Sequence, residues 1–261
     1  MASNIKAKKH LGQHFLIDNG VIDKILAAIS SHCAKDMPMI EVGPGPGVLT
    51  RKLVANYPLF QAVEFDRDMV KLLLQDIDPK HIINEDFLGL DLGTVHTDQE
   101  FNLVGNFPYN ISSQIVFKML DNMQRIPNMI GMFQKEVAER ICATPGTKKN
   151  GIITLLVQPY YEAIKLFDIG PEAFDPPPKV DSSVIFLKRK AALELPCDPK
   201  LYKSIIKLAF QQRRKKLRNT LKALITDTGA EVLQLRPEQL GVSDFINIAK
   251  EIEAQQASNP S

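Results

Sequence analysis

The chain has 261 residues, of which 44% are hydrophobic and 24% charged, with a formal net charge of +2, an ordinary composition for a soluble globular protein of one or two domains. It contains no apolar segment approaching the roughly 18 residues of a membrane span, and its first residues lack the apolar stretch of a secretory signal. Its three cysteines, at positions 33, 142 and 197, are scattered without a CxxC pair, which predicts neither a metal site nor a disulfide framework and favours a reducing cytoplasm.

Short β-strand patterns alternate with helical patterns in the first half of the chain. Strands are predicted at Met39–Gly43, Gln61–Asp66, His81–Asp86, Phe101–Asn106 and Asn128–Gln134. Apolar residues with helical spacing occur between and after them, at Val48–Asn56, Arg67–Gln75, Ser112–Met123 and Lys135–Ala143. Alternation of this kind predicts an α/β fold with a parallel, doubly wound sheet.

The pattern changes towards the C-terminus. Two later strand patterns, Ala163–Ile169 and Val180–Leu187, have no helix between them and are predicted to pair antiparallel at one edge of the sheet. A linker with two prolines follows Lys190, and after it long helices are predicted over Leu201–Leu224 and Ser243–Gln255. We therefore expect a larger domain of residues 1–190 and a small all-helical domain of residues 191–261.

Basic residues are unevenly distributed along the chain. Between Pro199 and Thr226 there are nine lysines and arginines and no acid, and residues 1–17 contain Lys6, Lys8 and Lys9 and no acid. Such asymmetry favours a polyanionic partner more than the small net charge does, although a solvated helix face is the plainer interpretation.

A glycine-rich loop, EVGPGPGVLT, follows the first predicted strand and leads into a helix. Gly43, Gly45 and Gly47 would let the backbone approach a ligand closely. However, Val48 stands where a GxGxxG dinucleotide motif needs its last glycine, and the two prolines remove N–H donors that a pyrophosphate would need. The loop therefore predicts a nucleotide-like ligand without a phosphate, unless it is only a turn.

Acidic residues end the next two predicted strands, Glu64 in VEFD and Asp86 in NED. Successive parallel strands end along one edge of a sheet, so these carboxyl groups and the glycine loop should form one pocket. An acid about 20 residues after the loop suits ribose hydroxyls, and Asp86 suits an adenine amino group. S-adenosylmethionine contains an adenosine and no phosphate, so the pattern predicts a methyltransferase that uses this cofactor and no metal.

The fourth predicted strand runs into NFPY, Asn106 to Tyr109. This resembles the [ND]-x-P-[YF] motif of N6-adenine methyltransferases. The Asn106 side-chain oxygen and the Phe107 carbonyl could accept both N6–H bonds of an adenine, while Pro108 fixes the direction of that carbonyl. Tyr109 would stack on the unstacked base. The alternative is an Asx-Pro turn with a tyrosine in the core.

A closer resemblance covers the chain from about Lys8 to Leu221. Six blocks are similar to the KsgA-type small-subunit ribosomal RNA adenine dimethyltransferases: KKHLGQHFLID, EVGPGPGVLT, NFPYNIS, FQKEVAERI, AFDPPPKVDSSV and FQQRRKKLRNTL. The resemblance implies a Rossmann-like class I methyltransferase domain followed by a small helical domain. It also implies dimethylation of two adjacent adenosines near the 3′ end of 16S ribosomal RNA in immature small subunits, with a role in their biogenesis. We expect a cytoplasmic monomer.

The resemblance also assigns roles to residues. Cofactor contacts carry over onto His14, Leu16, Gly43, Gly45, Glu64, Asp86 and Asn106. Phe107 replaces the more usual Leu or Ile, with little expected consequence because its role is through the backbone. Phe174 is a candidate for the opposite face of the base, the alternative being a Phe packed under its loop. RNA contacts are expected from Arg213, Arg214, Lys215, Lys216 and Arg218, with Lys6, Lys8 and Lys9 adding to the same surface.

Other functions compete with this interpretation. Methyltransferases that act on large-subunit RNA share LGQHFL and NFPYNIS with the small-subunit class, but the PPPKVDS and QQRRKKLRNTL blocks favour the latter. A non-enzymatic RNA-binding factor for ribosome assembly is the second class. A DNA adenine methyltransferase is a weaker alternative, because no separate sequence-reading domain is visible.

Overall fold

The structure, a computed structural model, describes residues 8, 11–225 and 230–258. Contacts divide the chain into two compact units. The first contains Met1–Ala138 and Glu162–Arg189, and the second contains Glu139–Tyr161 and Lys190–Ser261. Within the described residues no helix is both long enough and apolar enough to cross a membrane.

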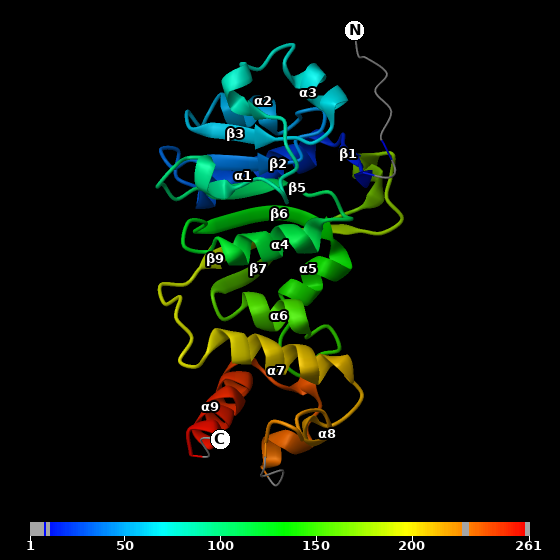
Figure 1. The fold of residues 1–261 in the computed structure, drawn as a ribbon. Coiled ribbons are helices and arrows are strands. Elements are labelled where there is room, and N and C mark those ends of the chain that lie inside the picture. The colour runs from blue at the N-terminus through cyan, green and yellow to red at the C-terminus, as the bar shows by residue number, and fades with distance from the viewer. Residues whose placement is uncertain (1–7, 9–10, 226–229, 259–261) are drawn as a thin grey trace. The chain divides into compact units, whose positions relative to one another are not determined.

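Seven of the described strands form one sheet in the order β4-β3-β2-β5-β6-β9-β7 (Figure 1). The strands are β2 (Met39–Val42), β3 (Phe60–Val63), β4 (Ile82–Ile83), β5 (Asn102–Asn106), β6 (Asn128–Gln134), β7 (Tyr161–Ile169) and β9 (Ser182–Arg189). Strands β4, β3, β2, β5 and β6 are parallel to one another, and β9 is antiparallel to β6. The five predicted parallel strands are thus confirmed, and the two later strands are neighbours at the end of the sheet, as predicted.

The helices of the first unit alternate with the strands along the chain. They are α1 (Asn19–His32), α2 (Thr50–Val54), α3 (Arg67–Leu73), α4 (Ser112–Asp121) and α5 (Lys135–Ile141), the last of which continues into the second unit. The side chain of Asp66 accepts from the backbone N–H of Asp68 and so caps α3, which satisfies a donor that the first helical turn leaves open.

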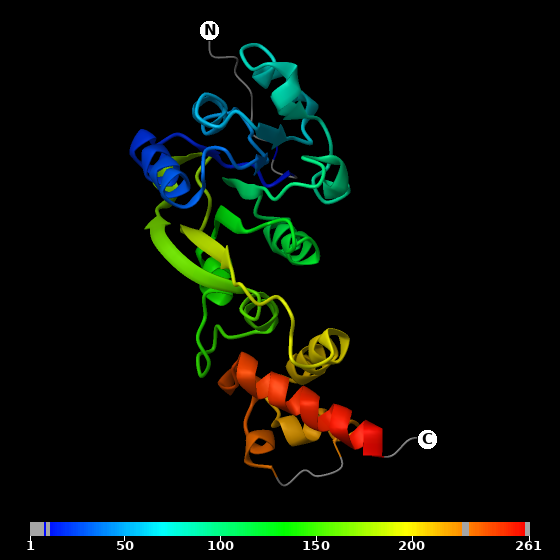
Figure 2. The ribbon, with the colours of Figure 1, turned by 90° about the vertical axis from the view of Figure 1, so that its left-hand side faces the viewer.

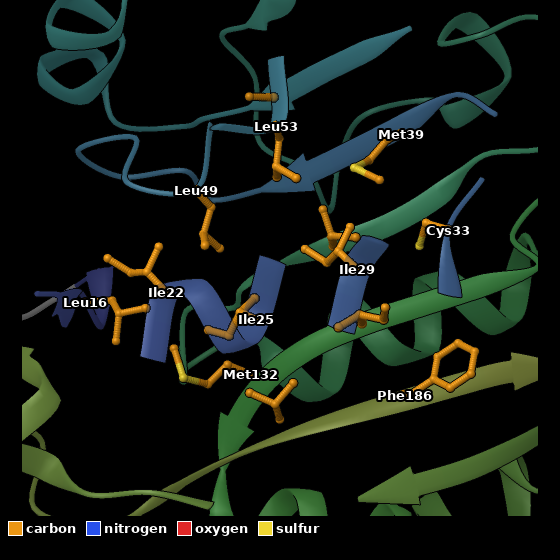
Figure 3. Close-up of a cluster of buried hydrophobic side chains, with 14 of the residues drawn as sticks. Leu16, Ile22, Ile25, Ile29, Cys33, Met39, Leu49, Leu53, Met132 and Phe186 are labelled. Carbon is orange, nitrogen blue, oxygen red and sulfur yellow. The ribbon is translucent and has the colours of Figure 1, made fainter. Parts of the chain in front are cut away.

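The N-terminal helix α1 was not predicted, although it packs one apolar face into the main core. Ile22, Ile25 and Ile29 are buried in the hydrophobic cluster of Figure 3, which also contains Met39 of β2 and Met132 of β6. Their spacing of three and four residues is the helical period, so the sequence already contained the signal for this helix.

A second, two-stranded sheet joins distant parts of the first unit. Strand β1 (Phe15–Leu16) pairs antiparallel with β8 (Phe174–Asp175). It places the N-terminal segment beside the proline-rich loop that precedes β9. Two-residue strands carry no periodicity, so sequence patterns do not reveal such a pairing.

The second unit is helical. It contains α6 (Ile152–Val157), α7 (Pro199–Gln211), α8 (Leu217–Thr220) and α9 (Val242–Ser258). Helices α7 and α9 contact each other, and Figure 2 shows α9 (red) beside α7 (yellow), which is seen nearly end-on. The long helix predicted over Leu201–Leu224 is wrong, because α7 ends at Gln211 and α8 begins only at Leu217. Residues 211–216 are all exposed and four of them are consecutive cations, so the segment offers no apolar face to pack and its like charges oppose a continuous helix.

Residues 139–161 belong to this second unit, whereas the predicted boundary at residue 190 assigned them to the first domain. Tertiary contacts explain the difference. The Tyr202 hydroxyl donates to the Leu155 carbonyl at 2.8 Å, and the Asn150 amide donates to the Leu240 carbonyl at 2.8 Å. The assignment of methyl transfer to residues 1–190 and of RNA binding to residues 191–261 stays a prediction.

Candidate active site

A cavity of about 260 Å³ opens in the first unit where β2, β3, β4 and β5 end. This is the edge at which open α/β sheets bind their ligands. The N-terminal segment 11–16 and the loops after these strands form its wall. Among the residues that line it are all those predicted for the cofactor and for the NFPY motif: His14, Leu16, Gly43, Gly45, Glu64, Asp86, Asn106, Phe107, Pro108 and Tyr109.

The glycine loop lies close to the NFPY motif. Gly43 has a φ of +67°, and a Cβ atom built there would lie 3.2 Å from the Pro108 ring. Both the left-handed backbone and the close approach favour glycine at this position. The loop after β2 therefore packs directly against the loop after β5.

Glu64 ties the glycine loop to the end of β3. Its Oε2 accepts from the Gly45 N–H at 3.0 Å, and its Oε1 accepts from the Asp66 N–H at 2.7 Å. Burial raises the pKa of Glu64, while these backbone N–H groups oppose the rise. The carboxyl group is therefore held rigidly, and each oxygen keeps a lone pair for a further donor.

Asp86 is exposed at the rim of the cavity, on the loop after β4. Its Oδ1 accepts from the Leu88 N–H at 3.0 Å, and Lys118 on α4 donates to the Leu88 carbonyl at 2.9 Å. These bonds fix the loop that carries the carboxyl group.

Two further residues of the cavity were missed in the sequence. Phe65, directly after Glu64, is 62% exposed and lines the cavity. Glu41, the acid inside the apolar strand β2, also lines it, but is only 2% exposed, and its Oε2 has no hydrogen-bond partner among the described residues. The signals were an aromatic residue after a strand-end acid, and a carboxyl group within a buried strand.

The side chains that line the cavity give it an acidic character. Glu41, Glu64 and Asp86 line it, and no lysine or arginine among the described residues does so. A phosphate group would lack cationic partners here, whereas a positively charged ligand would meet three carboxyl groups.

The Asn106 amide is oriented by the N-terminal segment. Its Nδ2 donates to the His14 carbonyl at 3.1 Å. This bond uses the amide's donor and leaves Oδ1 as an acceptor at the cavity wall. The Phe107 side chain is 1% exposed and packs edge-on against Phe133, with ring centroids 5.2 Å apart, so its ring belongs to the core.

Tyr109 is held by neighbours from two other segments. Its hydroxyl lies 2.5 Å from Ser182 Oγ at the start of β9. The His14 ring stacks beside it, with centroids 5.4 Å apart and planes at 28°. His14 Nδ1 in turn lies 2.8 Å from the Pro176 carbonyl, which requires the ring nitrogen to carry a proton and donate. One side of Tyr109 is thus covered by His14.

Phe174 is not brought together with these residues. It does not line the cavity, and its side chain is 2% exposed within the hydrophobic cluster that also contains Leu16. This is the arrangement expected of a Phe packed under its loop.

Of the basic residues predicted to contact RNA, four lie between α7 and α8 in the second unit, and Arg218 lies within α8. Arg213, Arg214, Lys215, Lys216 and Arg218 are all exposed. Arg213 donates to the Lys148 carbonyl, so its guanidinium also has a structural partner.

Of the three N-terminal lysines, only Lys8 lies in the described part of the chain, where it pairs with acids. Lys8 Nζ lies 2.6 Å from Asp66 Oδ1 and 2.7 Å from Asp68 Oδ2, and Gln13 Nε2 donates to Asp66 Oδ2 at 3.0 Å. The pairing raises the pKa of Lys8 and fastens the segment beside the cavity. The other two, Lys6 and Lys9, lie outside the described residues.

Comparison with known proteins places the chain in a family. The family model of ribosomal RNA adenine dimethylases matches residues 4–257. Ribosomal RNA small subunit methyltransferase A of Bacteroides fragilis is 46% identical over 259 residues, which cover 95% of this chain and 93% of that protein.

Two solved structures share the fold. The dimethyladenosine transferase of Plasmodium falciparum matches with a TM-score of 0.74 and 22% identity over 94% of this chain and 98% of its own. The 23S rRNA methyltransferase ErmE matches with a TM-score of 0.65 and 27% identity over 90% of this chain and 99% of its own. The predicted class I methyltransferase fold with a helical C-terminal part is confirmed, as is the resemblance to KsgA-type enzymes. The chain belongs to the family of ribosomal RNA adenine dimethylases.

Proposed function

We propose that this chain uses S-adenosylmethionine to dimethylate the N6 atoms of two adjacent adenosines near the 3′ end of 16S ribosomal RNA in immature small subunits. Its family makes it an rRNA adenine dimethyltransferase. The observation that carries the proposal is the acidic cavity at the sheet edge, which adjoins the Asn106–Tyr109 motif.

The cavity fits this cofactor by charge. S-adenosylmethionine carries a sulfonium and an ammonium group and no phosphate, and it supplies an already activated methyl group. The wall offers three carboxyl groups and, within the described part of the chain, no cation. One of these groups, Glu41, has an oxygen to which no described residue donates a hydrogen bond, and a positively charged ligand would compensate for this.

Different residues of the cavity wall would contact different parts of the cofactor. Glu64 would accept the ribose hydroxyls, and Asp86 would accept the adenine amino group. Phe65 and Leu88, which flank these acids and line the cavity, would contact the faces of the adenine ring. Gly43 and Gly45 allow close approach of the loop, and His14, Leu16 and Asn106 complete the contacts.

The NFPY motif would hold the target base. An exocyclic adenine amine is a poor nucleophile because its lone pair is conjugated with the ring. Acceptance of both N6–H bonds by Asn106 Oδ1 and the Phe107 carbonyl favours a tetrahedral nitrogen whose lone pair points at the methyl group. Tyr109 stacks on the base, and Pro108 sets the carbonyl direction. Positioning therefore supplies most of the rate enhancement.

RNA binding is assigned to the exposed cations between α7 and α8 and to Arg218 at the start of α8. Phosphate contacts and helix geometry dominate the recognition of structured RNA, so Arg213, Arg214, Lys215, Lys216 and Arg218 would position the protein while an unpaired adenosine reaches the cavity. Action as a monomer in the cytoplasm, with a second role in subunit assembly, is part of this proposal.

The test is methyl transfer to immature small subunits, naked 16S RNA and mature small subunits in parallel, read by mass spectrometry of the RNA. We expect N6,N6-dimethyladenosine at two adjacent positions of the immature subunits. Absence of any N6-methyl product would contradict the proposal. Methylation of naked 23S RNA instead would favour the large-subunit activity named for the structural relative ErmE.

A further inference from the structure

Glu41 is a buried acid of the cavity wall to which the proposed methyl transfer assigns no proton transfer. It lies within β2, where it pairs with Ala62 of β3 on one side and Val104 of β5 on the other. Its side chain reaches the cavity wall, and Oε2 has no hydrogen-bond partner among the described residues. A carboxylate in such a place would be poorly solvated and poorly paired, which favours its protonated form.

The surroundings of Glu41 keep the proton on it. The pKa of Glu41 is raised to about 8, mainly by burial; the Thr50 hydroxyl opposes the rise, and the negative charge of Glu64 adds to it. The other titratable groups of the cavity wall are those of His14, Asp86 and Tyr109, and the described wall contains no lysine or arginine. At pH 7 the ligand-free cavity therefore contains a mostly uncharged Glu41.

We propose that Glu41 is the titrating counter-charge of the cavity, which ionises when the cationic cofactor binds and regains a proton when the demethylated product replaces it. This inference rests on the proposed use of S-adenosylmethionine. A positive charge beside a buried carboxyl group favours its ionised form, and the attraction is strong where water is excluded. By linkage, a ligand that favours the ionised form of a group binds more tightly as the pH rises towards the pKa of that group.

The neighbouring carboxyl groups are less suited to this role. Both oxygens of Glu64 already accept backbone N–H bonds, which stabilise its ionised form. Asp86 is exposed to solvent and bonded to the Leu88 N–H. Glu41 alone of the three is both buried and left with an unpartnered oxygen in the described structure.

The cofactor and the product that it becomes after methyl transfer differ in charge. S-adenosylmethionine carries one positive charge more than S-adenosylhomocysteine, because methyl transfer converts its sulfonium into a neutral thioether. Ionised Glu41 would therefore hold the substrate form more strongly. After transfer, reprotonation of Glu41 would weaken its hold on the product, which has to leave before the next methyl group can be transferred.

Isothermal titration calorimetry tests this directly. The full chain is titrated at pH 7 with each of the two compounds, in two buffers of different ionisation enthalpy, so that released protons are counted. The wild type should release roughly one proton more with S-adenosylmethionine than with S-adenosylhomocysteine. Its Kd for S-adenosylmethionine should fall with rising pH, by up to about tenfold per pH unit, and level off near pH 8.

The decisive variant is Glu41→Gln, which has the shape of the protonated side chain. It should show no difference in proton release between the two compounds and a Kd that is nearly constant with pH. Glu162→Gln, an exposed acid on β7, serves as the matched control and should behave as the wild type.

Two results would overturn the inference: equal proton release by the wild type with both compounds, or unchanged proton release in Glu41→Gln. The first needs only the wild type, so it decides even if the variant does not fold. Failure of the wild type to bind S-adenosylmethionine would instead contradict the proposed function itself.

Discussion

The ring of Phe107 lies directly over Gly131 of β6, so closely that a Cβ atom at Gly131 would come within 2.1 Å of Phe107 Cε2. The two residues join the NFPY loop to the strand beneath it. A glycine here makes room for a buried aromatic ring, and the ring holds the loop in place from the core side while the backbone of Phe107 lines the cavity.

Substitution of either residue should lower stability, but only substitution of Gly131 should slow methyl transfer. We expect Phe107→Leu to keep methyl transfer near the wild-type rate and to lower stability by about 1 kcal/mol, since only packing is lost. Gly131→Ala should lower stability by about 1–3 kcal/mol through overpacking and reduce kcat by displacing the loop. Thermal unfolding and single-turnover methyl transfer measure both effects.

The double variant Phe107→Leu/Gly131→Ala is the control for this contact. Leucine is smaller than the ring that the new methyl group would strike, so the double variant should regain part of the lost stability. An additive loss in the double variant would show that the two residues act independently.

Asn106→Ala should separate catalysis from docking. The substitution removes both the Oδ1 acceptor at the cavity and the Nδ2 donor to the His14 carbonyl. We expect loss of methyl transfer with retained binding to immature small subunits, measured by mass spectrometry and by co-sedimentation. Lost binding in a variant that is still folded would mean that the catalytic and docking surfaces are not distinct.

The hydrogen bond between Tyr109 and Ser182 should contribute to the rate of transfer by fixing the stacking ring. Tyr109→Phe and Ser182→Ala each remove the same bond, so each should lower kcat by roughly fivefold, equivalent to about 1 kcal/mol. The double variant should be no slower than either single variant. Kd for the cofactor should change little, which calorimetry checks.

Ser183 provides the matched control on the same strand. It is also buried, but its hydroxyl donates to Asp168 at 2.6 Å, outside the cavity. Ser183→Ala should therefore lower stability without a comparable loss of kcat. If Ser182→Ala and Ser183→Ala reduce kcat equally, the role of Ser182 in orienting Tyr109 is refuted.

Stability of the ligand-free chain should depend on pH through Glu41. The pKa of Glu41 is about 8 in the folded chain, against an ordinary value of 4.5, so the folded state binds the proton more tightly than the unfolded state. Its stabilising contribution is complete below about pH 4.5, declines as pH rises to about 8, and is constant above that. Thermal unfolding between pH 5 and 9 should show that the stability of Glu41→Gln, relative to that of the wild type, increases with pH up to about pH 8. A constant difference across this range would rule out a titrating Glu41.

Removal of cations between α7 and α8 should weaken RNA binding and should also make the binding less dependent on salt concentration. Arg214→Gln and Lys216→Gln are suitable because, unlike Arg213, neither has a backbone carbonyl partner recorded in the described structure. Each should lower the slope of log K against log salt concentration by roughly 0.7–0.9, measured by filter binding to immature small subunits. Lys24→Gln, on exposed α1 surface of the first unit, should leave the slope unchanged.

Local patterns sufficed for the main sheet and for much of the candidate site. The strands that end at Val42, Val63 and Asn106 are rich in buried apolar residues, and glycines, acids or the NFPY motif follow them in chain order. Because parallel strands bring their ends to one edge, order along the chain was enough to predict that Glu64, Asp86 and Asn106 would line one cavity. Helix α1 has an equally clear pattern, with Ile22, Ile25 and Ile29 at helical spacing.

Other features depend on contacts between segments that are far apart in the sequence. Apolar spacing alone could not show that α7 stops before the cations at 213–216, that Phe174 packs into the core, or that Lys8 pairs with Asp66. Burial and pairing are properties of the assembled chain, because they depend on which side chains the fold brings within a few ångströms. The sequence by itself thus determined the family, the sheet and the chemical groups at its edge. Only the tertiary structure decided that Glu41 is a buried acid with one oxygen unpartnered among the described residues, since desolvation exists only once the neighbouring strands have closed around it.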